Sequence, residues 1–303
     1  MDNLILMFTC LLAGVGFQKI KAIPANAHAA LNQLAIYMLL PAITLYYIPK
    51  LHISQELIYP VCAAWGSFLF SWAFFAALGT LLKWPKKLQG CLILTAGFLN
   101  SSFVGFPVIE ALYGKKGLET AILVDQPGSF VMLSTLGIII AVLYSGGELR
   151  AGMVAQRVLL FPPFIAFTIG LLMNIAAYDF VLPLQSVLQK LGSCLTPVAL
   201  VAVGLQLKID AKSKHLGFLS LGLFVKLLLI PFIFLMVYKG LLRKEGAYID
   251  ISIMETAMPP MITAAIIASS HGLKPRLAGM MVGIGIPLSV LTLAFWYFVL
   301  KHW

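Results

Sequence analysis

Charged residues are scarce in this chain of 303 residues, because only 11% are Asp, Glu, Lys or Arg while 61% are hydrophobic. Soluble proteins have about 25% charged residues. So few charges exclude a cytosolic catalytic domain, a nucleotide-hydrolysing motor and a nucleic-acid-binding protein, despite a formal net charge of +10. Together with a mean hydropathy of +0.98, the composition predicts an integral membrane protein.

Cysteines are few, and catalytic motifs are absent. The four cysteines lie inside apolar stretches without the paired spacing of a disulfide or a metal site, and they are Cys10, Cys62, Cys91 and Cys194. No P-loop, zinc-protease or serine-hydrolase motif is present. An intramembrane enzyme would need a nucleophile with a base in reach, and Ser101 and Ser102 have no histidine in their segment. We expect no cofactor, no metal and no enzymatic activity.

Apolar stretches fill most of the chain. A helix needs about 20 apolar residues to cross ~30 Å of hydrocarbon. Charges, prolines and polar clusters divide the sequence into ten such stretches, at roughly 4–20, 31–48, 57–82, 89–112, 120–144, 158–177, 184–207, 216–240, 249–270 and 277–300. The longest connection is about a dozen residues, between Ser145 and Arg157. We therefore predict one all-α bundle of ten transmembrane helices.

The distribution of Lys and Arg predicts the orientation in the membrane. With the N-terminus outside, the inner loops carry twelve of these residues and the outer loops eight. Because short inner loops are enriched in Lys and Arg, both termini are predicted on the outer side. The basic excess also suits anionic lipid head groups. No positive charge precedes Phe17, so we expect the first segment to remain as a helix rather than to act as a cleaved signal peptide.

The two halves of the sequence resemble each other at two places. Residues 31–42, with a Leu-Asn-Gln-Leu run followed by Pro-Ala, resemble residues 188–199, with Leu-Gln-Lys-Leu followed by Pro-Val-Ala. Residues 113–118 likewise align with residues 271–276. Similarity at a fixed offset indicates an internal repeat.

We expect the repeats to be residues 1–145 and 146–303, with five of the ten predicted helices in each. An odd number of helices makes the second repeat enter the membrane from the opposite face. Such an inverted pair is typical of secondary transporters, in which the substrate path lies at the repeat interface.

Segments 89–112 and 249–270 are the least lipid-like. The first contains Pro107 and the second contains the Pro259-Pro260 pair. A proline removes a backbone donor and clashes with the preceding turn, so both helices are predicted to break near mid-membrane, although an isolated proline can merely kink a helix. Broken backbone at that depth must line protein or a water-filled cavity.

Half-helices that start after these prolines would direct their positive dipole ends at the centre of the membrane, where an anion would bind. The candidate substrate-binding residues are Asn100, Ser101, Ser102, Gly105, Pro107, Thr256, Met258, Pro259 and Pro260.

Four ionisable residues lie at membrane depth, and burying a charge there is costly enough to make each a functional candidate. Glu110 is the weakest, because it lies near the membrane interface. Asp125, Glu255 and Lys226 are candidates for ion or proton coupling. Lys226 either pairs with a carboxylate, caps the carbonyls of a broken helix or meets an anion.

These motifs resemble those of the auxin efflux carrier family. Asn100-Ser101, Gly105, Pro107 and Tyr113-Gly114 are similar to the family's fourth helix, Ala257-Met258-Pro259 resembles its ninth, and Pro41 and Pro197 match its second and seventh. The resemblance covers the whole chain. It implies a bile-acid-symporter-like fold with helices four and nine crossing at prolines, an elevator-like motion of a transport domain against a scaffold, and a homodimer as in plant members.

By this resemblance, Asn100 and Ser101 would line the anion site, and Pro107 and Pro259 would mark the crossing. Two departures separate the chain from plant auxin exporters. The long regulated loop between helices five and six is missing, so phosphorylation control is not expected. Pro260 stands where plant members carry a polar residue, which makes a bacterial organic-acid permease the closer picture.

The sequence thus predicts a secondary active transporter of a small organic anion, such as a mono- or dicarboxylate, in a bacterial inner membrane. An anion-binding sensor or channel is the alternative. An intramembrane enzyme is the third and weakest interpretation.

Overall fold

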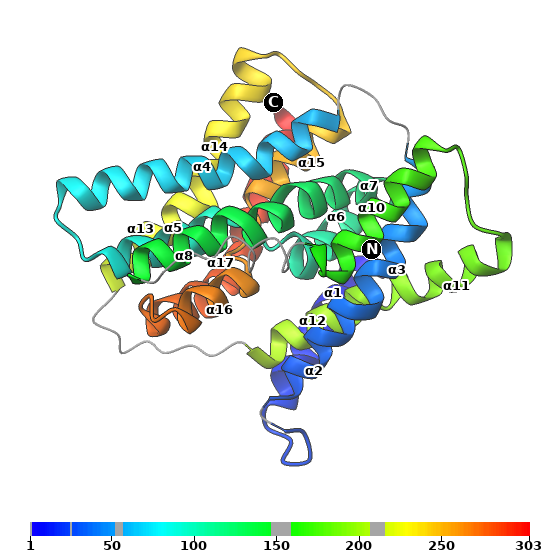
Figure 1. The fold of residues 1–303 in the computed structure, drawn as a ribbon, viewed down its shortest axis with the longest axis horizontal. Helices are drawn as coiled ribbons and strands as arrows, with labels where there is room; N and C mark the ends of the chain where they lie inside the picture. Colours follow the sequence, from blue (N-terminus) through cyan, green and yellow to red (C-terminus); the bar gives the residue numbers. More distant parts are fainter. Residues whose placement is uncertain (1, 25, 52–56, 147–158, 207–215) are drawn as a thin grey trace.

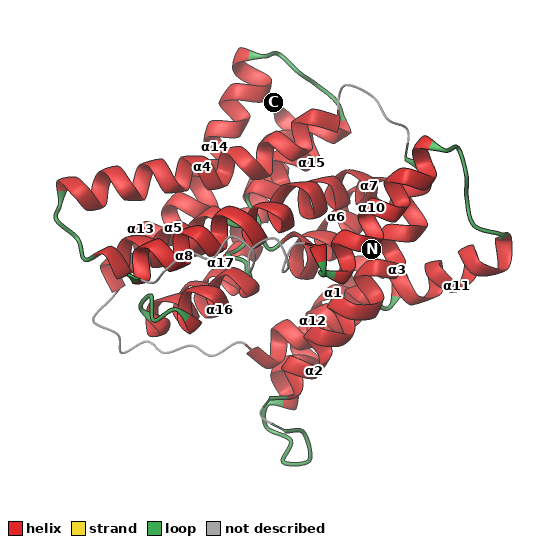
Figure 2. Ribbon diagram, viewed as in Figure 1, coloured by secondary structure: helices red, strands yellow, loops and turns green. Residues whose placement is uncertain are grey.

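The computed structural model describes residues 2–24, 26–51, 57–146, 159–206 and 216–303, and within these ranges the chain is helical with no β-strand (Figures 1 and 2). The expected all-α class is confirmed. The predicted loop between Ser145 and Arg157, and the basic residues at 150, 157, 208, 212 and 214 that entered the orientation argument, lie largely outside the described residues.

The helical elements, with η for 3₁₀ and π-helical turns, follow in chain order. They are α1 (Asp2–Phe17), α2 (Ala27–Leu34), η1 (Ala35–Leu39), α3 (Leu40–Tyr47), η2 (Ile48–Lys50), α4 (Ile58–Leu81), α5 (Lys86–Gly97), η4 (Ser101–Gly105), α6 (Phe106–Tyr113), α7 (Lys115–Leu123), η5 (Val124–Phe130), η6 (Leu133–Gly137), α8 (Ile138–Ser145), α10 (Pro162–Ile175), α11 (Leu182–Ser193), α12 (Leu195–Gln206), α13 (Leu216–Phe224), η7 (Val225–Leu229), α14 (Ile230–Leu235), η8 (Met236–Leu241), α15 (Ala247–Thr256), α16 (Ile262–Ser270) and α17 (Pro275–His302).

Six continuous helical stretches of the described chain are long and apolar enough to cross a membrane: Ala27–Lys50, Ile58–Leu81, Lys115–Ser145, Leu182–Leu205, Leu216–Leu241 and Pro275–His302. Their outer faces carry large apolar side chains, such as Leu81 and Leu291, which are 78% and 70% exposed. Exposed apolar surface on this scale fits lipid rather than water. The count of ten spans and the inverted repeat stay predictions.

Prolines explain four of the six π-helical turns of the described chain; η6 and η8 have no proline within or just after them. Such turns end two residues before Pro41, Pro107 and Pro231, and η5 contains Pro127. A proline cannot donate to the carbonyl four residues earlier, and its ring clashes with that carbonyl. A wider turn relieves the clash without ending the helix.

Packing divides the helices into two groups (Figure 1). In the first group, α1 packs along α12, and α3 packs against α10 and α11. In the second, α4 packs against α5, η5 and α15, and α16 packs against α17. The groups meet where α12 contacts η4, α1 contacts α6 and α10 contacts η5.

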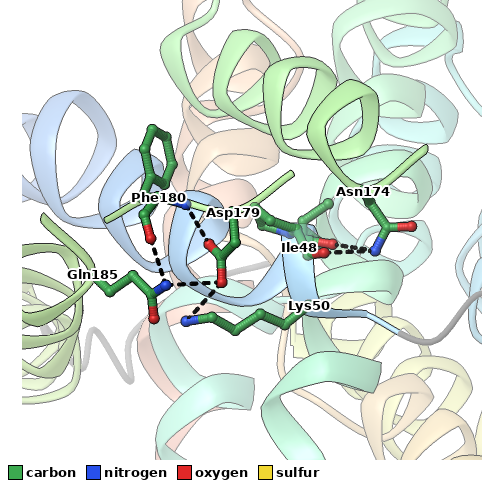
Figure 3. Close-up of polar contacts among 7 residues, drawn as sticks. Ile48, Lys50, Asn174, Asp179, Phe180 and Gln185 are labelled. Atoms are coloured by element: carbon green, nitrogen blue, oxygen red, sulfur yellow. Dashed lines mark hydrogen bonds and ion pairs between the residues drawn. The ribbon is translucent and has the colours of Figure 1, made fainter. Parts of the chain in front are cut away.

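One polar contact of the first group joins the two halves of the sequence (Figure 3). The side-chain amide nitrogen of Asn174 lies 3.1, 2.9 and 2.6 Å from the carbonyl oxygens of Ile48, Pro49 and Leu51. Ile48 and Pro49 belong to the last turn of the 27–50 helix, whose carbonyls need partners beyond the helix, and Leu51 follows it; the Ile48 carbonyl also accepts the backbone N–H of Leu51 at 3.2 Å. Asp179 lies nearby and forms an ion pair with Lys50 at 3.8 Å. Asn174 therefore caps the first group's central helix.

We predict that Asn174→Leu lowers the stability of the protein by about 1–3 kcal/mol, because the carbonyl oxygens of Pro49 and Leu51 lose the Asn174 donor and that of Ile48 keeps only the backbone N–H of Leu51. Asp179→Asn is the control, since it breaks a partly exposed ion pair worth at most about 1 kcal/mol. The measurement is the thermal unfolding midpoint of both variants in the same detergent. Equal losses in the two variants would contradict the capping role.

Candidate functional site

Two helices that lie far apart in the sequence are interrupted at the motifs that the sequence singled out. Residues 98–100 separate α5 from η4, and residues 257–261 separate α15 from α16. Pro259 and Pro260 explain the second interruption, because neither can donate a backbone hydrogen bond and a residue before a proline avoids the α conformation.

The two interruptions hydrogen-bond to each other. Leu99 and Pro260 form an antiparallel β-bridge. The backbone N–H of Asn100 donates to the carbonyl of Pro259 at 3.1 Å, and its side-chain nitrogen donates to the carbonyl of Pro260 at 3.4 Å. The side-chain oxygen of Asn100 is buried without a partner, so this amide keeps a free acceptor.

The first interruption lies earlier than the sequence predicted. The half-helix was expected to start after Pro107, but helical structure resumes at Ser101 and continues through Pro107 into α6. This expectation is wrong because the π-helical turn Ser101–Gly105 accommodates the proline, whereas pairing with residues 259 and 260 stabilises extended backbone before Ser101. The second half-helix starts two residues after Pro260, as expected.

Glu255 lies at the centre of the site. It is fully buried, and both of its carboxylate oxygens lack a hydrogen-bond partner among the described residues. A Cβ atom on Gly105 would lie only 2.7 Å from each of these oxygens, so Gly105 permits the close approach of η4 to α15. The Ser101 hydroxyl lies close to this carboxylate without hydrogen-bond geometry, and the charges of Asp125 and Lys226 act on it electrostatically.

Lys226 lies beside the same helix end. It is fully buried in η7, and its ammonium donates to the carbonyl of Thr256 at 3.1 Å. Thr256 is the last residue of α15, so the ammonium occupies the negative end of that helix. Of the three alternatives left open for Lys226, the structure shows it capping a carbonyl of an interrupted helix.

Asp125 links η5 to η4. Its carboxylate accepts hydrogen bonds from the Ser102 hydroxyl at 2.5 Å and the Gln126 side chain at 2.8 Å. Gln126 and Ser129 belong to the same element, η5. The side-chain oxygen of Gln126 and the hydroxyl of Ser129 are buried and have no hydrogen-bond partner among the described residues. Sequence reasoning missed Gln126 and Ser129, although a polar run next to Asp125 inside an apolar segment was a usable signal.

The remaining candidates contribute backbone or packing. The hydroxyl of Thr256 is occupied, because it donates to the carbonyl of Ile253 at 2.7 Å. Thr256 contributes to the site through its backbone carbonyl, which accepts a hydrogen bond from Lys226. Met258 and Pro107 are buried apolar side chains. Glu110 is only partly buried and accepts a hydrogen bond from Thr196 of α12 at 3.3 Å, which places it where the two helix groups meet.

Long apolar helices that enclose charged and polar groups at paired helix interruptions are the architecture of a membrane transporter. Comparison with known proteins agrees. A family described as membrane transport protein matches residues 1–297, and the chain belongs to this family. The resemblance to auxin efflux carriers is thereby confirmed.

Two archaeal relatives carry the name "uncharacterized transporter". The protein of Methanothermobacter thermautotrophicus is 25% identical over 280 residues, covering 90% of this chain and 89% of its own length. The protein of Methanocaldococcus jannaschii is 24% identical over 320 residues, covering 100% of this chain and 99% of its own. The family and the relatives are transporters and not enzymes. Because the chain also has several long apolar helices, it is an integral membrane protein of a transporter family.

We predict that Gly105→Ala lowers stability by about 1–3 kcal/mol, because the added methyl group overlaps the Glu255 carboxylate. Combining it with Glu255→Asp, which retracts the carboxylate by one methylene, should recover part of the loss. Gly279→Ala is the matched control, since nothing lies within 4 Å of the added carbon. Thermal unfolding of the variants in detergent is the measurement. A loss for Gly105→Ala no greater than for Gly279→Ala would disprove the close contact.

Proposed function

We propose that this protein is a secondary active transporter of a small organic anion, a mono- or dicarboxylate, which binds where the two interrupted helices pair. The Leu99–Pro260 bridge is the observation that carries the proposal. It joins the starts of the helices Ser101–Tyr113 and Ile262–Ser270. Free N–H groups and the positive dipole end at a helix start favour an anion.

The finer architecture belongs to the same proposal. Residues 1–145 and 146–303 form two inverted repeats of five helices, and the interruptions are their equivalent broken helices. The group containing α1, α12 and α10 is the scaffold, and the group containing α4, α5 and α15 is the transport domain that moves as an elevator. The division of the helix packing into two groups supports this assignment. The homodimer, the outward termini and the bacterial inner membrane rest on the family resemblance and on the basic loops.

Asp125 and Glu255 are the proposed proton-coupling groups. Both carboxylates are buried, and they interact electrostatically with each other. A cycle that loads and releases a proton changes the charge enclosed in the site, which can be linked to binding of an anion. The competing function is a sensor or channel that binds the anion without uphill transport.

The test is uptake of labelled malonate, malate, lactate and indole-3-acetate into proteoliposomes. We expect saturable uptake of at least one acid and no unit conductance, because a carrier binds and releases its substrate in each cycle. Asn100→Ala should raise KM about tenfold, the effect of losing one hydrogen bond of roughly 1.4 kcal/mol, because the second N–H of the Asn100 amide can donate to a carboxylate. Asn32→Ala is the control, since this asparagine lies in α2 outside the site.

The same assay with an imposed pH gradient at zero membrane potential examines proton coupling. Asp125→Asn or Glu255→Gln should abolish the response to the gradient while the protein stays monodisperse. A full response in both variants would remove these groups from the coupling mechanism. Unchanged KM in folded Asn100→Ala would show that the anion binds elsewhere, and unit conductance would favour the channel.

A further inference from the structure

Lys226 presents a buried positive charge that substrate binding does not explain. It lies in η7, in the middle of the apolar stretch Leu216–Leu241, and has no exposed surface. Its ammonium donates to the carbonyl of Thr256 at the end of α15. The anion is proposed to bind at the starts of the half-helices, so this hydrogen bond is not part of that site. An isolated ammonium in such surroundings is costly unless it is paired.

The neighbourhood of Lys226 is negative. Asp125, Lys226 and Glu255 are the fully buried charged side chains of the described chain. Glu255 attracts Lys226 electrostatically but makes neither of the two ion pairs that the described residues form. The ends of α5 and α17, which pack against η7, carry further charges, namely Lys86, Lys87, Arg276 and Lys301. All four of those side chains lie in exposed positions of the helix termini.

The two groups beside the ammonium have the chemistry of cation ligands. Thr256 supplies a carbonyl at the negative end of α15, and Glu255 supplies two carboxylate oxygens without hydrogen-bond partners. Carbonyl and carboxylate oxygens are the ligands that hard metal cations prefer. The ammonium therefore stands where a free monovalent cation would find a carbonyl ligand from Thr256 and the negative charge of Glu255, whose carboxylate could turn toward a cation once the lysine side chain is removed.

We propose that Lys226 is a tethered cation, which fills this position so that the protein needs no free metal cation there. Replacing Lys226 with a small neutral residue leaves the Glu255 carboxylate and the end of α15 without a compensating charge, and so creates a site for Na⁺. Residue 226 thus determines whether the site requires a free cation. The inference extends the proposed function to its ion requirement, but its main test measures binding to the protein and not transport.

The experiment compares wild type and Lys226→Ala by thermal unfolding in detergent, in NaCl, KCl, ethylammonium chloride and choline chloride at equal ionic strength. Wild type should unfold at the same temperature in all four salts. In choline chloride, Lys226→Ala should unfold roughly 5–15 °C lower, because a buried pair has lost one partner. Its midpoint should rise with the logarithm of the Na⁺ or ethylammonium concentration, as expected when a ligand binds the folded state.

Three controls separate this role from packing. Lys226→Met loses the charge but fills most of the space, so added cations should not restore it. Lys226→Ala with Glu255→Gln removes the carboxylate ligand, so the specific response to Na⁺ should disappear. Lys239→Ala is the matched lysine, since Lys239 forms a 2.8 Å ion pair with Asp250 in a partly exposed position. It should show no preference among the salts.

Two results would overturn the proposal. One is a loss of stability in Lys226→Ala that no cation reverses, which would make Lys226 a packing residue. The other is stabilisation of wild type by Na⁺ over choline, which would mean that a free cation binds beside the ammonium. If Lys226→Ala cannot be purified, Lys226→Ser answers the same question, because Ser is also small and neutral and leaves the same space for a cation. Absent uptake by wild type would contradict the proposed function and leave these binding results intact.

Discussion

Backbone groups inside a membrane have no water to bond to, and this constraint governs the centre of the protein. Two helices end near the middle of the molecule, and each would leave unpaired N–H and C=O groups. The bridge between Leu99 and Pro260, with the two hydrogen bonds from Asn100, supplies partners across the two halves of the chain. The pairing satisfies backbone groups of both interruptions, and it brings two helix ends and two helix starts together.

The charges at this centre follow from the same geometry. The end of α15 is negative and holds the ammonium of Lys226, while Gly105 has no side chain and lets the Glu255 carboxylate approach η4. Ser102 binds Asp125 and so joins η4 to η5. Asp125 and Lys226 therefore each have a hydrogen-bond partner on another element, and Glu255 approaches η4 at Gly105, so a change at one helix interruption would alter the electrostatics of the rest.

Local sequence patterns predicted the chemistry of the site better than its geometry. Apolar runs predicted the helical segments, and charges at membrane depth identified Asp125, Lys226 and Glu255, because such charges are rare for an energetic reason. The first interruption was placed at Pro107, since proline is a strong local signal, but the extended backbone before Ser101 depends on residues about 160 positions away. The cap by Asn174 and the orphaned oxygens of Gln126 and Ser129 likewise depend on long-range packing.

The most direct test of the central claim is whether the paired interruptions open to each side of the membrane in turn. Ser101→Cys, in a chain whose four native cysteines are replaced, would be treated with a membrane-impermeant thiol reagent from either side of sealed vesicles. We expect labelling from both sides, slowed by the transported acid, because the fully buried Ser101 becomes accessible only as the helix groups move. Labelling from one side alone under all conditions would contradict it.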